Sequence, residues 1–360
     1  MYKRKIALVA TLCISLLLVS ILATVNASEV GFKEVVQNSI ISKYFNFNEN
    51  QLKSELKKIK TKELIEEINS FSSDVSNSEL IPFVSELFER KNELNDKDIL
   101  SKIKDNSNSV RTQEIMVDLY IEKKEGISDQ SEIKQLLKDT TIRKEVKSRI
   151  VLNSKFDNGD LELLKELIVE NKDILAFNSL KKLSKVNKRE AYLISKEILS
   201  NLESESKLRI SAAQKSAAKF LRSSDDTKAK KEFISQTMKI IDNSETDLML
   251  KDSSVFALSE IMSKESIIAI IKSESIDKEL KAFSIEQNYH VLKKMLQTAP
   301  SEDDIRIVIK AMEILPIVDL YDDLKDVNAT IKNQDLKNRC SKVIDTIKVN
   351  GIKATQKWLD

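Results

Sequence analysis

Apolar residues recur with the spacing of an α-helix along most of the chain. After Leu336, for example, apolar or small residues follow four, seven and eight positions later, at Cys340, Val343 and Ile344. Residues with this spacing share one face of a helix, while polar residues occupy the other face. The pattern therefore predicts a series of amphipathic helices, each with one side available for packing.

Many of these predicted helices open with the same phrase, an apolar residue followed at once by a basic one. The copies are Val110-Arg111, Ile142-Arg143, Leu208-Arg209, Leu250-Lys251, Leu280-Lys281, Ile305-Arg306 and Leu336-Lys337. Their successive spacings are 32, 66, 42, 30, 25 and 31 residues, and a degenerate copy over residues 174–183 divides the longest interval. With that copy included, 226 residues span seven intervals of about 32 residues each.

A second amphipathic segment lies between successive phrases, so the sequence predicts a repeated helix–turn–helix unit. Two such helices cannot bury their apolar faces alone, whereas stacked copies bury them between neighbours. Ser301 is expected to cap a helix with an acidic first turn, and Asp160 to cap the helix after the Asn158-Gly159 turn. The fourth position after the apolar residue is often small, which predicts close helix–helix approach at Ala212, Ser254, Ser284 and Cys340.

Three copies share a longer signature, in which a turn containing Asp precedes the apolar–Arg pair and small residues follow. They are DNSNSVRTQEIM (105–116), KDTTIRKEV (138–146) and EDDIRIVIKAM (302–312). In this signature the chain resembles the HEAT-like repeat family, from about Asp96 to the C-terminus. The resemblance implies an all-α fold, an α-solenoid of stacked antiparallel helix pairs. The 333 residues after the signal segment, at about 32 residues per repeat and less irregular ends, predict eight to ten pairs. Its extended concave surface would hold a protein or peptide partner.

The resemblance also implies a role for the basic residue of each phrase. In HEAT-like repeats this residue commonly bonds an Asp near the same turn and links one repeat to the next. The structural repeat positions are Arg111, Arg143, Arg209 and Arg306, and their candidate partners are Asp105, Asp139 and Asp304. The alternative interpretation is a ladder of arginines that binds a ligand.

Composition supports long helices, because strands and tight turns need Gly and Pro. The chain has only 4 Gly and 3 Pro, and aromatic residues make up 5%. These values favour the all-α class over any sheet-containing fold. An abundance of Lys, Ile and Asn indicates a bacterial, Gram-positive source.

The first residues form a separate segment. A basic start, MYKRK, is followed by an apolar run over residues 6–25 and a small-residue site that ends at Ala27. This arrangement predicts a signal peptide over residues 1–27, cleaved after Ala27. Because about 20 apolar residues suffice to span a bilayer, an uncleaved signal anchor stays open. In both cases the rest of the chain lies outside the cytoplasm, secreted or at the cell surface.

Two further regions follow the signal segment. Residues 28–95 have helical patterns without the repeat signature, and we interpret them as degenerate repeats or an N-terminal cap. Residues 96–360 form the HEAT-like repeats, with Trp358 and Leu359 expected to seal the C-terminal end.

Charge argues against nucleic acid as a partner. Residues 1–27 carry three of the 59 basic residues and no acidic ones, so 56 basic and 57 acidic residues remain, a net charge of −1. Positions two and six after each apolar anchor, such as Ile210 and Gln214, mix signs and polarities and form no track for phosphates. We expect no nucleic-acid partner, and membrane contact only through the N-terminal segment if that segment is not cleaved.

Candidate chemistry is sparse. His290 is the single histidine and Cys340 is the single cysteine outside the signal segment, so we expect structural roles for both. Glycines at 31, 126, 159 and 351 are too few and too far apart for a phosphate-binding loop. We therefore expect no catalytic, metal-binding or cofactor-binding residues.

Together these patterns predict an exported, non-enzymatic protein that binds a protein or peptide on a helical-repeat surface. One alternative is an enzyme or enzyme subunit of the HEAT-repeat lyase type, which attaches pigments to cysteines of other proteins. The other alternative is a membrane-anchored structural protein.

Overall fold

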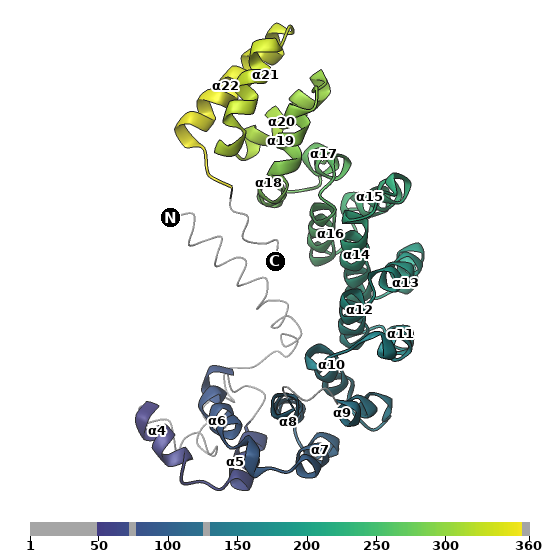
Figure 1. Ribbon diagram of the computed structural model, residues 1–360, viewed down its shortest axis with the longest axis vertical. Coiled ribbons are helices and arrows are strands. Elements are labelled where there is room, and N and C mark those ends of the chain that lie inside the picture. Colours follow the sequence, from purple (N-terminus) through teal and green to yellow (C-terminus); the bar gives the residue numbers. More distant parts are fainter. Residues whose placement is uncertain (1–48, 72–76, 125–129, 355–360) are drawn as a thin grey trace. The chain divides into compact units, whose positions relative to one another are not determined.

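The computed structural model describes residues 49–71, 77–124 and 130–354. Over these residues every regular element is a helix (Figure 1), and one isolated β-bridge joins Ile317 and Ile352. The predicted all-α class is therefore confirmed for this part of the chain.

Several sequence-based expectations fall on other residues. The signal peptide over residues 1–27, its cleavage at Ala27 and the alternative anchor over residues 6–25 lie outside the described residues. The same holds for Trp358 and Leu359.

The chain divides into two compact units, residues 1–123 and 124–360. The helices of the first unit are α4 (Glu49–Leu56), α5 (Thr61–Ser70), α6 (Asn77–Glu89), the short 3-10 helix η1 (Lys91–Glu93), α7 (Asp96–Lys104) and α8 (Val110–Lys123). Helices α4 and α5 pack against α6, and α8 packs against α5 and α7. The boundary expected from the sequence, between residues 95 and 96, lies inside this unit.

Arg90, directly after α6, connects α6 to the end of α4 in the first unit. The Arg90 guanidinium donates hydrogen bonds to the main-chain oxygens of Leu56 (2.8 Å) and Ile59, at the end of α4. It also pairs with Glu86 at 2.6 Å, and the two side chains are only 12% and 9% exposed. The Leu56 carbonyl also accepts the Ile59 N–H at 3.1 Å, so Arg90 adds a second donor at the end of α4 and supplies a donor to the Ile59 carbonyl in the turn that follows.

The second unit consists of consecutive helices joined by short turns. Its α-helices are α9 (Ser131–Gln135), α10 (Lys144–Asn153), α11 (Leu161–Glu170), α12 (Ile174–Val186), α13 (Lys188–Ser200), α14 (Lys207–Arg222), α15 (Thr227–Asp242), α16 (Leu248–Glu260), α17 (Lys264–Lys272), α18 (Lys278–Gln287), α19 (Tyr289–Gln297), α20 (Glu302–Ile314), α21 (Tyr321–Thr330) and α22 (Gln334–Asn350). Short 3-10 helices lie at η2 (Leu136–Lys138), η3 (Asn158–Asp160), η4 (Leu202–Ser204) and η5 (Val318–Leu320).

Packing in the second unit follows a regular alternation. From α10 to α22, each even-numbered helix contacts the next even-numbered helix, and from α15 to α21 the odd-numbered helices do the same. From α11 onward, each odd-numbered helix also packs against the even-numbered helix that follows it. Figure 1 shows α12, α14 and α16 in one row, with α11, α13 and α15 in a second row beside them.

The repeated phrase marks the even-numbered helices. Each copy lies at or next to the start of one of them, including the degenerate copy, which coincides with α12. Side chains cap many helix starts by accepting a main-chain N–H, which stabilises a helix by about 1 kcal/mol. The capping residues are Asn95, Asp173, Asn187, Ser206, Asp226, Asp247, Ser263, Asp277, Ser301 and Asn333.

The predicted cap at Ser301 is confirmed, and Asp304 completes a reciprocal capping box with it. The predicted cap at Asp160 is wrong. Its carboxylate accepts hydrogen bonds from the Asp157 N–H (3.0 Å) and the Lys134 ammonium (2.7 Å). A short 3-10 turn precedes α11, so this side chain closes the turn and makes no cap of α11.

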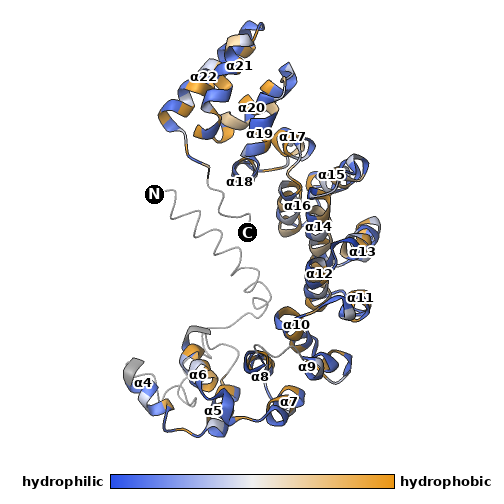
Figure 2. Cartoon of the chain, viewed as in Figure 1, coloured by the Kyte–Doolittle hydropathy of each residue, from blue (hydrophilic) through white to orange (hydrophobic). Residues whose placement is uncertain are grey.

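The cores lie between the helices, where buried apolar residues of successive elements pack together. Figure 2 shows that the helices carry both hydrophobic and hydrophilic positions, as amphipathic helices do. Burying a Leu or Ile side chain stabilises the fold by roughly 1.5–3 kcal/mol. The small residues predicted at close helix contacts, Ala212, Ser254, Ser284 and Cys340, are all buried. Helix α14 buries four alanines, which lets α13 pack closely against it.

Buried hydrogen bonds also join successive even-numbered helices. The Asn178 amide of α12 donates to the Ser148 hydroxyl of α10 at 2.7 Å. The Ser259 hydroxyl of α16 donates to Ser284 of α18 at 2.6 Å. Because a buried polar group needs a partner, these pairs fix the register of α12 against α10 and of α18 against α16.

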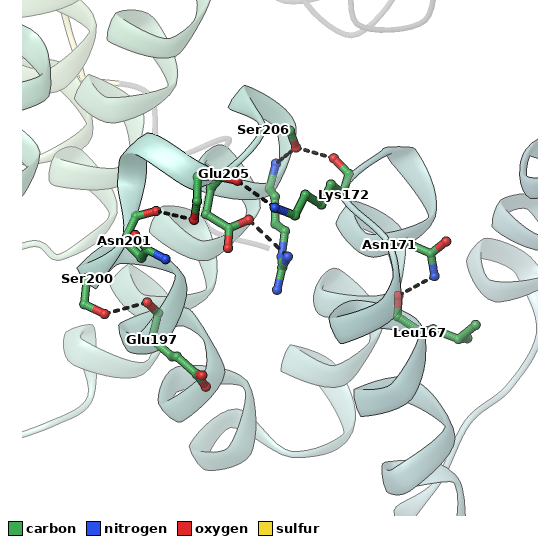
Figure 3. A network of polar contacts seen from close by, with 10 residues as sticks. Leu167, Asn171, Lys172, Glu197, Ser200, Asn201, Glu205 and Ser206 are labelled. Carbon is green, nitrogen blue, oxygen red and sulfur yellow. Dashed lines mark hydrogen bonds and ion pairs between the residues drawn. The ribbon is translucent and has the colours of Figure 1, made fainter.

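The turns before successive even-numbered helices are joined as well (Figure 3). The Lys172 ammonium donates to the Ser204 carbonyl at 2.8 Å, and the Ser206 hydroxyl donates to the Lys172 carbonyl. Lys172 precedes α12 and Ser206 caps α14. Each turn therefore donates a side-chain hydrogen bond to a main-chain carbonyl of the other turn.

Candidate binding face

Helix α14 is almost enclosed by its neighbours and leaves one narrow stripe at the surface. Helices α12, α13, α15 and α16 all contact it. Its exposed residues are Lys207, Lys215 and Arg222, and all are basic. Lys219, half-buried, lies on the same stripe, because positions 215, 219 and 222 follow helical spacing.

Helix α12 presents the same chemistry in the same register. Its exposed residues are Lys181 and Lys185. Lys215 and Lys219 lie 34 residues after Lys181 and Lys185, respectively, so they occupy equivalent positions on the neighbouring helix. We call Lys181, Lys185, Lys215 and Lys219 the lysine face.

The lysine face concentrates like charge. Lys219 interacts electrostatically with Lys185 and Lys215, and Lys215 interacts with Lys181. Burial lowers the pKa of Lys181, Lys215 and Lys219, and the neighbouring ammonium groups lower each pKa further. Lys215 shows this shift although it is exposed, because the surrounding helices displace part of the water around its ammonium group.

One acidic group opposes this charge. Glu260, at the end of α16, partly opposes the lowering of the pKa of Lys215 and Lys219, but its carboxylate is already bound to Arg222 at 3.3 Å. Over the described residues, the side chains of the lysine face make no hydrogen bond or ion pair of their own, whereas Lys207 pairs with Asp247 at 3.0 Å. The lysine face therefore carries charge that the rest of the described structure does not neutralise.

The next even-numbered helix presents a different chemistry. The exposed residues of α16 are Leu248, Met249 and Phe256, which are 70%, 49% and 39% exposed. The Phe256 ring meets the Phe283 ring of α18 edge to face, with centroids 5.0 Å apart. Phe256 lies near the lysine face, because Glu260, one turn further along α16, interacts with Lys215 and Lys219 of the neighbouring helix α14.

Two of the structural arginines form ion pairs within their own turns. Arg209, 8% exposed, pairs with Glu205 at 3.0 Å, and Arg306 pairs with Glu302 at 3.6 Å. Arg111 lies in the first turn of α8 and Arg143 directly precedes α10.

The suggested Asp partners also have described contacts. Asp304 binds the Lys264 ammonium of α17 at 2.7 Å, so a lysine makes this connection between neighbouring helix pairs. Asp105 and Asp139 accept main-chain N–H groups from Ser107 and Thr141 in their own turns.

Residues with catalytic potential are dispersed. Cys340 is fully buried in α22, and burial raises the pKa of its thiol to about 11. His290 lies on α19, where burial and Arg222 lower the pKa of its imidazole. Within residues 49–71, 77–124 and 130–354, no group of His, Cys, Asp and Glu side chains is arranged to hold a metal ion. None of the helices over those residues combines the length and apolarity that crossing a membrane requires.

Sequence reasoning missed the lysine face because it tested the wrong positions. Two and six residues after Leu208 stand Ile210 and Gln214, and both are buried. The exposed stripe lies seven and eleven residues after the anchor, at Lys215 and Lys219. The available signal was the recurrence of Lys at positions i and i+4 in two helices 34 residues apart.

A comparison of the sequence with models of known protein families and with curated proteins finds no match. The likeness to HEAT-like repeats therefore rests on the repeated phrase in the sequence. The lysine face and the apolar surface of α16 are the features from which a function can be argued.

Proposed function

We propose that this protein is an exported, non-enzymatic binding protein with a HEAT-like α-solenoid architecture. The alternating contacts of even- and odd-numbered helices support the solenoid, because stacked helix pairs make contacts of this kind. In this architecture one helix of each pair contributes to a continuous surface. We assign that surface to the outward stripes of α12, α14 and α16.

One observation carries the proposal. The exposed residues of these three helices are sorted by chemistry, with only basic residues on α12 and α14 and only apolar residues on α16. A surface without a binding role is expected to mix charges of both signs, which favours solubility. Sorted surface of this kind is typical of a site that contacts another macromolecule.

Recognition would proceed by shape, charge and apolar contact over several helices, without a chemical step. The described residues support such binding, since buried hydrogen bonds fix α12 against α10 and α16 against α18. The partner would be a protein or peptide, held without a cofactor.

Export rests on the N-terminal segment and has its own test. We expect the mature protein, recovered from the medium or the cell surface, to begin at Ser28. N-terminal sequencing measures this directly. A chain that retains residues 6–25 in the membrane fraction would replace secretion by anchoring.

Binding is tested by capture of proteins from cell-surface extracts on the immobilised chain. The expected result is a protein that is retained in a saturable manner and is displaced by excess free chain. The heat-unfolded chain, immobilised in the same way, serves as the control. Failure to retain any macromolecule above this control would contradict the proposed function.

A further inference from the structure

The lysine face is a cluster of positive charge without bonded carboxylates among the described residues. Its four ammonium groups gather on two adjacent helices, and over the described residues no carboxylate is bonded to any of them. Glu260 is near, but it already pairs with Arg222. An anionic ligand would therefore bring opposite charge to ammonium groups that at present interact mainly with one another.

The surroundings limit what kind of anion fits. Along α16 the basic character ends, because Asp252 and Glu260 lie on either side of Phe256 in that helix. A long polyanion such as a nucleic acid, which tracks a continuous basic groove, would meet these carboxylates. A short run of carboxylates fits the two lysine-bearing helices and stops before α16.

The apolar surface beside the lysine face adds a second requirement. Phe256 is 39% exposed and rests against Phe283, so part of its ring is open to contact from outside. An aromatic or aliphatic side chain placed there would cover apolar surface that is now in water. A ligand with carboxylates and one neighbouring apolar group would satisfy both parts of the surface.

We propose that the lysine face binds an acidic segment of a partner protein, in which carboxylates contact α12 and α14 and an adjacent apolar side chain packs on Phe256. This inference rests on the proposed binding function and specifies the chemistry of its partner. It differs from a general affinity for anions, because the apolar contact and the nearby carboxylates select a protein segment.

The test uses the full chain and a short fluorescein-labelled peptide in which a run of glutamates precedes a phenylalanine. Fluorescence anisotropy measures its affinity. We expect saturable binding that weakens roughly tenfold when salt rises from about 50 mM to about 300 mM, because screening reduces attraction between exposed charges. A peptide with Gln in place of Glu is expected not to bind, and one with Ala in place of Phe to bind several-fold more weakly.

Variants assign the binding to this surface. The combination Lys181→Gln, Lys185→Gln, Lys215→Gln and Lys219→Gln is expected to weaken peptide binding by at least roughly tenfold. The matched control carries Lys196→Gln, Lys228→Gln, Lys231→Gln and Lys239→Gln on exposed positions of α13 and α15, and should bind as the parent chain does. Circular dichroism establishes that both variants remain folded.

The variant Glu260→Gln is expected to raise the affinity for the acidic peptide instead of lowering it. Removing the nearby carboxylate is expected to tighten binding of the acidic peptide several-fold, since one repulsive charge is lost. Unchanged or weaker binding by this variant would argue against the lysine face as the site.

Two results would overturn the inference. One is equal loss of binding in the control variant, which would mean that attraction to the overall charge is responsible. The other is tighter binding of a single-stranded oligonucleotide of equal charge, which would assign the surface to phosphates.

The outcome is separable from that of the proposed function. If the lysine-face variant still captures the parent chain's protein partner, the binding function stands and this inference fails. If the peptide binds at the lysine face but no protein is captured, the chemistry of the surface stands and the proposed function fails.

Discussion

Gln214 of α14 and Ser254 of α16 are bound to each other through both groups of the glutamine amide. The Gln214 Nε2 atom donates to the Ser254 hydroxyl at 2.8 Å, and Oε1 lies 3.1 Å from the same oxygen. Both residues are fully buried. The Ser254 hydroxyl can also donate to the Leu250 carbonyl of its own helix at 2.7 Å. Ser254 therefore has a second hydrogen-bond partner, whereas over the described residues the Gln214 amide bonds only to Ser254.

This asymmetry predicts unequal effects of substitution. Ser254→Ala strands a buried amide and is expected to lower the free energy of unfolding by about 1–3 kcal/mol, and Gln214→Leu by less. The double variant should lose less than the sum of the two, as measured by urea unfolding. Gln236→Leu, at an exposed position of α15, is the control and should change stability by less than about 0.5 kcal/mol. Strict additivity would mean that the two side chains do not interact.

Arg90→Met is expected to destabilise the first unit by about 2–4 kcal/mol, because it leaves the Glu86 carboxylate unpaired in a mostly buried position and removes the donor to the Ile59 carbonyl. Thermal unfolding followed by circular dichroism measures the change. Adding Glu86→Gln should restore part of the loss, since the unpaired charge disappears. Arg189→Met, exposed on α13, should have little effect. A similar loss in both arginine variants would contradict the role assigned to Arg90.

Lys182 predicts a pH dependence of stability. Burial, together with Lys185 and Lys181, lowers its pKa to about 8 from the ordinary 10.5, while its ammonium donates to the carbonyls of Leu152 (2.9 Å) and Ser154 (2.8 Å). Below the folded pKa both states are protonated, so the cost of burying the charge is constant there. Between the two pKa values the unfolded chain binds more protons, and stability is expected to rise with pH.

Urea unfolding at about pH 7.5 and about pH 9.5 tests this expectation. The parent chain should gain stability across that interval relative to a Lys182→Met variant, which lacks the titrating group. Lys231→Met, exposed on α15, should keep the dependence of the parent chain. If Lys182→Met and the parent chain respond alike, the lowered pKa is not the cause.

Cys340 is expected to resist alkylation in the folded protein. Its thiol is fully buried, and the pKa of about 11 keeps it protonated at neutral pH, where the thiolate is the reactive form. Incubation with iodoacetamide, followed by peptide mass spectrometry, separates Cys340 from Cys13. Modification should become complete only in denaturant. Rapid modification under native conditions would show that α22 opens readily.

The sequence allowed the helices to be placed because their signals are local. The phrase at Leu336, the small residue at Cys340 and the cap at Ser301 each depend on neighbours within two turns of the same helix. Each of these expectations matches the structure. The failure at Asp160 is also local, because a 3-10 turn runs directly into α11 and the Asp160 carboxylate accepts the Asp157 N–H of that turn.

The candidate site was harder to predict because exposure depends on packing between helices. Lys215 became recognisable only once the neighbours of α14 were known to bury the rest of that helix. The Lys264–Asp304 ion pair could not be predicted from the sequence either, because it joins residues 40 positions apart. A helical pattern identifies the side that packs, but it does not determine which residues of neighbouring helices meet.

The alternation of contacts has a consequence for local unfolding. The main contacts of α22 are with the helices that precede it, α20 and α21, whereas α12 and α14 pack against helices that precede them and helices that follow them. The C-terminal helices can therefore fray while the centre of the second unit stays ordered, and amide exchange should fall from that end inward. A partner bound at α12 and α14 would protect the middle of the array and leave its end free to open.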